Sequence, residues 1–234
     1  MAGEADDFRI DIDLDHAARE AARIRDWLSA LRRRHDLSRF EYTRLVQIVP
    51  AGPTHSHPIL TLGTRFTETE DLLLATYLHE QMHWYLWLLG GPDHDPIAPF
   101  YDELVRRYPK APIKLPEGAR NYEQTYLHLV VCWLEVAAVT ELIGRERAEA
   151  LCDTQWGYRW IYRTVVADRE ALGALLREHG IYPMRPPGEL TGRQRPVRGE
   201  AVSAVRKRNP RAAAPQRSRR SRRRPPGRGG TSAG

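Results

Sequence analysis

Residues 68–89 read ETEDLLLATYLHEQMHWYLWLL, and this stretch decides how the rest of the chain is interpreted. It is a long, mostly apolar run that follows a β-branched segment. Thr67 and Glu70 form a T-x-x-E pattern, the capping box that opens many helices. Gly90 and Gly91 provide a stop signal. The sequence therefore predicts a long apolar helix over about 68–89.

The centre of this helix carries the pattern HExxH, as His79-Glu80-Gln81-Met82-His83. Residues four apart share one face of a helix, so both imidazoles can reach one ion. Neutral imidazoles suit Zn²⁺, and Glu80 stands where it can take a proton from a water activated by that metal. The alternative is a set of hydrogen-bonded core residues, although such polar groups are costly to bury without a partner. We predict His79 and His83 as zinc ligands and Glu80 as the general base.

Together with the strand before it, this helix resembles the zincin metallopeptidases. The metzincin branch is excluded because Leu86 and Leu89 stand where it has a glycine and a third histidine. The inverted HxxEH pattern is absent as well. The resemblance is therefore to the gluzincin branch, which takes its third ligand from a glutamate on a later helix. It implies a zinc-dependent peptidase that acts on peptide or protein substrates.

The expected order of elements is α+β with helix dominant. We predict an N-terminal helix over about 15–34, a small sheet with strands over about 42–49 and 58–66, and the HExxH helix over about 68–89. A glutamate-bearing helix over about 121–143 and a C-terminal helix over about 153–179 follow. Residues FRIDIDL near the N-terminus are either a short strand or an extended arm, and PFYDELVRRY is a short helix. By the resemblance, the strand over 58–66 is an edge strand that pairs with an extended substrate.

The later helix carries His128 and Glu135, seven residues apart, in an otherwise apolar run. Seven residues rotate a helix by about 700°, so both side chains share one face. A buried carboxylate needs a cation, and we predict Glu135 as the third metal ligand with His128 beside it. Two alternatives stay open, namely His128 as the ligand and a metal-free hydrogen-bonded pair. Cys132, one turn from both, is expected to be a small core residue.

One position departs from the gluzincin pattern. Many members have an aspartate four residues after the ligand glutamate, which orients a zinc-bound histidine, and here that position is Val139. The orienting role would then fall to His128, Glu141 or Asp102.

Two tyrosines are candidates for stabilising the oxyanion, a role that zincins commonly give to a tyrosine or histidine. Tyr158 and Tyr162 lie four apart in WGYRWIYRTVV and share a helix face. The alternative for each is aromatic packing. His55 and His57 are either a satellite metal site or solvated loop residues, and His94 is expected in a loop.

Charge is unevenly placed along the chain. Residues 186–234 carry 14 of the 36 Lys and Arg residues but only two of the 30 acidic ones, and they have almost no large apolar residues. We predict a metallohydrolase domain over 1–185 and a disordered basic tail over 186–234. With two cysteines and no signal peptide or membrane span, a cytoplasmic location is expected.

The leading hypothesis is a zinc-dependent peptidase. One rival is another zinc-dependent hydrolase on the same scaffold. A second rival is a nucleic-acid-associated protein whose tail contacts phosphates without sequence preference.

Overall fold

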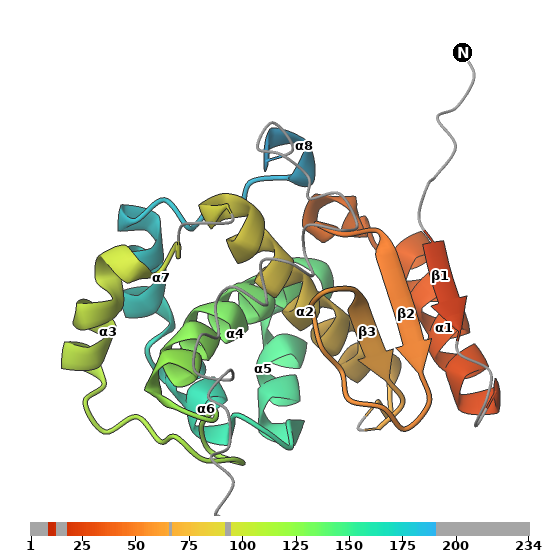
Figure 1. Cartoon of the computed structure of the whole chain (residues 1–234), viewed down its shortest axis with the longest axis horizontal. Helices are drawn as coiled ribbons and strands as arrows, with labels where there is room; N and C mark the ends of the chain where they lie inside the picture. The colour runs from red at the N-terminus through yellow and green to blue at the C-terminus, as the bar shows by residue number, and fades with distance from the viewer. Residues whose placement is uncertain (1–8, 13–17, 66, 92–94, 191–234) are drawn as a thin grey trace, which may run out of the picture. The chain divides into compact units, whose positions relative to one another are not determined.

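The computed structural model describes residues 9–12, 18–65, 67–91 and 95–190 (Figure 1). Its elements in chain order are β1 (Arg9–Ile12), α1 (Ala18–Arg34), η1 (Leu37–Phe40), β2 (Leu45–Val49), β3 (Leu60–Gly63), α2 (Glu70–Gly90), η2 (Ala98–Phe100), α3 (Tyr101–Arg107), α4 (Tyr122–Ile143), α5 (Arg145–Thr154), α6 (Arg159–Ala167), α7 (Arg169–Glu178) and α8 (Pro187–Leu190). The predicted helix-dominated α+β class is confirmed.

The strands form one parallel sheet in the order β1-β2-β3. Helix α1 connects β1 to β2 and packs on the sheet, as parallel neighbours require a crossover. FRIDIDL is therefore a strand over Arg9–Ile12, in register with Leu45–Ile48. The sheet lies on one side of α2 and α4, while α3 and α7 lie on the other (Figure 1).

The connection from β2 to β3 contains no helix and returns along the outer edge of β3. Thr61 exchanges both backbone hydrogen bonds with His55 in an antiparallel bridge, at 2.8 and 3.0 Å. The next outward amide, that of Gly63, donates to Thr54 Oγ1 at 2.9 Å. The edge of β3 is thus paired within the chain. The sequence led us to expect an open edge strand here. The structure differs because the short connection between β2 and β3 itself runs back beside β3.

Helix α2 begins at a different cap from the one predicted. Thr69, not Thr67, is the N-cap, and its hydroxyl accepts a hydrogen bond from the amide of Leu72. Thr67 is buried and donates instead to the carbonyls of Gly63 and Arg65. The helix ends at Gly91, whose φ of 75° lies in the left-handed region that glycine tolerates.

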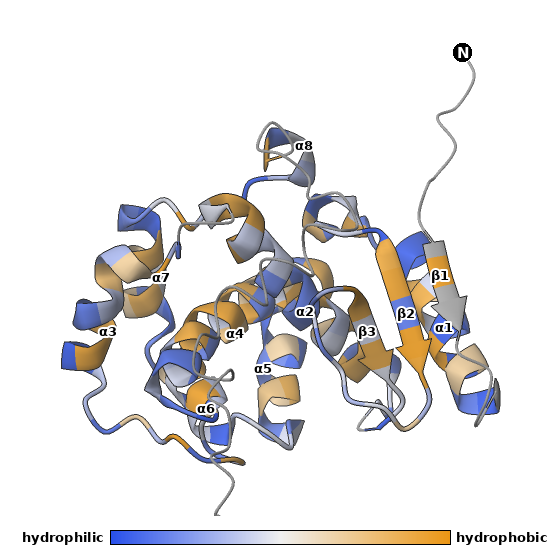
Figure 2. Cartoon of the chain, in the orientation of Figure 1, coloured by the Kyte–Doolittle hydropathy of each residue, from blue (hydrophilic) through white to orange (hydrophobic). Residues whose placement is uncertain are grey.

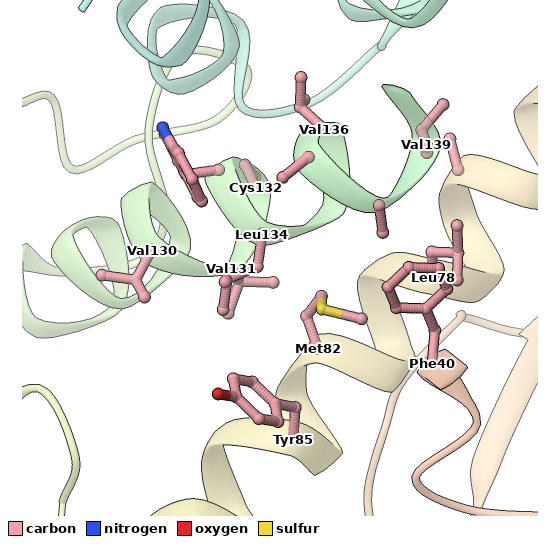
Figure 3. Packing of buried hydrophobic residues seen from close by; sticks show 14 of the residues in the cluster. Phe40, Leu78, Met82, Tyr85, Val130, Val131, Cys132, Leu134, Val136 and Val139 are labelled. Carbon is pink, nitrogen blue, oxygen red and sulfur yellow. The ribbon is translucent and has the colours of Figure 1, made fainter. Parts of the chain in front are cut away.

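Helices α2 and α4 pack against each other and form the centre of the core. Leu78, Met82 and Tyr85 of α2 face Val131 and Leu134 of α4 in Figure 3, and all five are buried. Figure 2 shows α4 as largely hydrophobic. This helix is long and apolar enough to cross a membrane, but 72% of its most apolar stretch is buried inside the fold. A core helix of a soluble protein has this property.

The predicted single helix over 153–179 is wrong. The structure has α5, α6 and α7 instead, with breaks at residues 155–158 and at Asp168. The first break begins at Gln155, whose ψ of 127° is extended, and it ends at Tyr158, whose φ of 59° and ψ of 30° are left-handed. Neither conformation continues a right-handed helix. The predicted stop at Gly180 is confirmed, with a φ of 66°.

The folded part extends further than predicted, to Leu190. Helix α8 lies inside the expected tail and packs on α2 and η1, with Leu190 buried. The first compact unit spans Met1–Arg195, and the second, Pro196–Gly234, lies outside the described residues, as does most of the predicted tail.

A buried polar network fixes the back of α2 against the start of β2. Gln81 accepts hydrogen bonds from the amides of residues 42 and 43, at 2.8 and 3.0 Å, and donates to Tyr77 Oη at 2.9 Å. Tyr77 donates to the carboxylate of Glu41, which also accepts from Arg32 Nε at 2.8 Å. Gln81, Tyr77 and Glu41 therefore each have hydrogen-bond partners, as buried polar groups require.

Replacing Arg32 with Ala should destabilise the fold by about 3 kcal/mol, because it leaves a buried carboxylate without its cation. The Glu41 side chain is 1% exposed. Urea unfolding measures the change. The matched control is Arg39→Ala, which removes an exposed pair with Glu141 and should change the free energy of unfolding by less than about 1 kcal/mol. Equal effects of the two substitutions would contradict the role of the buried pair.

Candidate metal centre

Three imidazoles converge at the contact between α2 and α4. His79 and His83 come from successive turns of α2, and His128 comes from α4. Their ring centroids are 5.1 to 5.5 Å apart, and one nitrogen of each lies within 4.8 Å of the other two. The sequence placed His79 and His83 on one face of a helix, and the fold brings His128 to the same point.

Hydrogen bonds fix which nitrogen two of these rings offer. His128 Nδ1 lies 2.7 Å from the carbonyl oxygen of Gln124, which can only accept, so Nδ1 carries the hydrogen. His79 Nδ1 lies 2.9 Å from Glu135 Oε2 and donates to that carboxylate. In each ring Nε2 is left as the nitrogen able to bind a metal, and partners of this kind typically orient metal-ligating histidines.

A second group of potential ligands consists of His79, Cys132 and Glu135. All three are buried, and Glu135 Oε2 already accepts hydrogen bonds from His79 and from Tyr162 Oη, at 2.9 and 2.7 Å. Cys132 and Glu135 do not line the cleft described below. Glu135 therefore contacts His79 at Nδ1 and stands outside the lining of the cleft. This geometry supports His128 rather than Glu135 as the third ligand, the alternative that the sequence left open.

Burial shifts the pKa values of the ionisable side chains at the site. It lowers the pKa of His83 well below its usual value and that of His128 to about 3, with the neighbouring His79 adding to both shifts. Burial also acts to lower the pKa of His79, but its contacts with Cys132 and Glu135 outweigh this and raise it. Burial raises the pKa of Glu80 to about 7. Neutral imidazoles at His83 and His128 are the form that binds metal ions.

The three imidazoles and Glu80 line a cleft of about 640 Å³. One wall is the β2–β3 connection, residues 51–56, and residues 155–158 form another part of the lining. Two residues other than glycine have a positive φ in the described part of the chain, Ala51 and Tyr158, and both line this cleft. Such strained conformations concentrate at functional sites.

The two candidate tyrosines both border the cleft but differ in what their hydroxyls contact. Tyr162 is buried and donates its hydroxyl to Glu135, so this hydroxyl already has a partner. Tyr158 lines the cleft, with its ring centroid 4.4 Å from that of His128. No residue in the described ranges forms a hydrogen bond with the Tyr158 hydroxyl. Of the two, only Tyr158 has a hydroxyl that is free to meet a ligand.

Other predicted residues do not join the three imidazoles. His55 lines the cleft without belonging to a ligand group, and His57 stacks on Trp84 at 4.2 Å. Asp102 is exposed on α3, and Glu141 pairs with an arginine at the surface. His94 lies outside the described residues.

Sequence reasoning missed the roles of Gln124 and of residues 51–56. Gln124 acts through its backbone carbonyl, and no side-chain pattern reports such a contact. For residues 51–56 the sequence indicates only a loop, because their Gly and Pro residues do not reveal the return path along β3. The spacing of four residues between Gln124 and His128 was the one signal in the sequence for this contact.

The donor set fits zinc. Three histidine nitrogens that converge on one point from two packed helices are a ligand set known for catalytic zinc. Comparisons of the chain with protein-family models, with curated proteins and with solved structures gave no match.

Replacing Tyr162 with Phe should weaken zinc binding by about 10-fold, because Glu135 loses the hydroxyl that holds its carboxylate beside His79. The dissociation constant is measured by competition with a chelator. The absorption spectrum of the Co²⁺-substituted protein should also change, which a purely structural role would not cause.

The matched control is Tyr85→Phe. Tyr85 is also buried and donates to a backbone carbonyl, that of Ile181, at 2.6 Å. This control should lower stability but leave zinc affinity and the cobalt spectrum unchanged. Equal zinc affinities for Tyr162→Phe and the wild type would reject the positioning role.

Proposed function

We propose that this protein is a zinc-dependent peptidase whose metal is held by His79, His83 and His128. The observation that carries the proposal is the convergence of three imidazoles beside a cleft-lining glutamate. When bound, Zn²⁺ supplies Lewis acidity toward a carbonyl and makes water a better acid. The zincin resemblance of the HExxH helix agrees with this function, although the ligand set differs from the gluzincin expectation.

The residues of the cleft have separate tasks in this proposal. Glu80 takes a proton from the attacking water and returns it to the leaving amine. The Tyr158 hydroxyl donates a hydrogen bond to the oxygen that becomes negatively charged. Glu135 and the carbonyl of Gln124 hold the rings of His79 and His128 in the orientation that presents Nε2.

The substrate would lie along residues 51–56 rather than pair with β3. The edge of β3 is already paired with His55, so residues 51–56 of the connection are the segment that borders the cleft. An extended peptide suits a wall of backbone groups. This wall favours a peptide substrate over the other hydrolase substrates that the HExxH pattern allows.

The test is metal analysis of the purified protein, followed by a hydrolysis screen against unfolded proteins and peptides. We expect one zinc per chain and cleavage that a chelator abolishes and zinc restores. A zinc-supplemented protein that carries no stoichiometric metal would reject the proposal. A protein that binds zinc but cleaves esters and no peptide would favour another hydrolase.

A further inference from the structure

Two large apolar side chains lie exposed beside the cleft. Trp156 is 51% exposed and belongs to the cleft wall. Leu115 is 50% exposed and lies against Gly157, the next residue of the wall, with its Cδ2 atom 3.7 Å from the place where a Cβ would stand. Together they extend the cleft wall outward with an apolar surface.

This apolar wall is held in place by backbone hydrogen bonds. The amides of Arg159 and Trp160 donate to the carbonyls of Pro116 and Glu117, at 2.9 and 3.1 Å. Arg163 also forms an ion pair with Glu117. The loop that carries Leu115 is therefore tied to the segment that carries Trp156. A surface fixed in this way loses little conformational entropy when a ligand binds.

Exposed large apolar side chains are rare in the part of the chain that the structure describes. There are four, namely Ile113, Leu115, Tyr122 and Trp156. Trp156 lines the cleft, and Ile113 and Leu115 belong to the tied loop. Tyr122 differs, because it stacks on Tyr126 and projects from α4 on the side away from Gln124 and His128, which are two and six residues further on. Exposed apolar side chains that lie together beside a cleft can form part of a ligand-binding groove.

We propose that Trp156 and Leu115 form a subsite for one large apolar side chain of the substrate, close to the scissile bond. The inference rests on the proposed peptidase function and adds a substrate class to it, peptides with a residue such as Leu or Phe at that position. A peptide is the occupant because Trp156 and Gly157 are also walls of the cleft that holds Glu80. Two side chains are far too few for a stable interface with a second copy, which needs about 800 Å² per partner.

The experiment measures binding apart from turnover. The zinc-loaded Glu80→Gln protein is titrated calorimetrically with N-acetylated, C-amidated hexapeptides that carry Leu, Ala or Glu at one position. The varied position is moved along the peptide one residue at a time. At one position the Leu peptide should bind about 10-fold more tightly than the Ala peptide. Trp156→Ala and Leu115→Ala should each remove most of this preference.

Tyr122→Ala is the matched control, because Tyr122 is also 50% exposed but lies on the other side of α4. It should leave the preference unchanged. Equal binding of the Leu and Ala peptides at every position would overturn the subsite, while hydrolysis of both by the wild type would leave the peptidase function standing. A zinc-loaded wild type that neither binds nor cleaves any peptide would reject both. Concentration-dependent dimers that Trp156→Ala dissociates would show that the wall binds a second copy instead.

Discussion

Replacing Glu80 with Gln should reduce peptide hydrolysis by about 10²–10⁴-fold, the usual contribution of a general base. The amide has nearly the shape of the carboxylate but cannot take a proton from water. Glu80 lies in the cleft wall beside His79 and is not among the residues that converge as ligands. Zinc content and the unfolding midpoint should therefore stay close to those of the wild type.

The measurement is the kcat/KM for one cleaved peptide, with zinc content determined on the same samples. Gln124→Ala is a suitable control, since its side chain lines the same cleft while the group that holds His128 is the backbone carbonyl. It should keep most of the activity. Undiminished turnover in Glu80→Gln would mean that the chemistry lies elsewhere.

Replacing His128 with Ala should abolish stoichiometric zinc binding, because it removes one of three converging imidazoles. Glu135→Gln should be milder. Its amide oxygen can still accept from His79 Nδ1, so we expect zinc affinity to fall by about 10–100-fold, the range for groups that orient ligands. Zinc dissociation constants for the two variants measure the ranking directly.

His55→Ala is the matched control for this ranking, because it removes a histidine that lines the same cleft outside the converging group. It should bind zinc as the wild type does. If Glu135→Gln loses zinc while His128→Ala retains it, the ligand is Glu135, as the sequence first suggested, and His128 is a neighbouring residue.

The two central helices could be predicted closely from the sequence. The expected ranges 68–89 and 121–143 compare with Glu70–Gly90 and Tyr122–Ile143. Both helices are long, apolar and bounded by local signals, namely a capping side chain at the start and a glycine at the end. Even so, the cap of α2 was assigned two residues early, since Thr67 and Thr69 fit the start of a helix equally well.

The break between α5 and α6 could not be predicted in the same way. The start of α6 depends on Tyr158 taking a left-handed conformation that costs a tyrosine energy, while the preceding Gly157 would take it readily. Local propensity assigns such a conformation to glycine. Tertiary contacts, among them the ring of Tyr158 against that of His128, accompany the conformation and have no signature in the sequence.

The third ligand was ambiguous for a geometric reason. His128 and Glu135 share one face of α4 but are separated by about 10 Å along its axis, at 1.5 Å per residue. Which of them meets His79 Nε2 depends on where α2 crosses α4, and periodicity carries no information on that crossing. In the structure His79 lies between the two, with one ring nitrogen toward Glu135 and the ring itself beside His128.

The pairing of His55 with Thr61 has a consequence for self-association. Outer strands with unsatisfied amides and carbonyls are templates on which further chains add, and this is a route to fibrils and domain-swapped oligomers. Here the outward groups of Thr61 and the amide of Gly63 are satisfied by residues 54–55 of the same molecule. The edge of β3 itself is therefore closed to strand addition by the segment that connects it to β2.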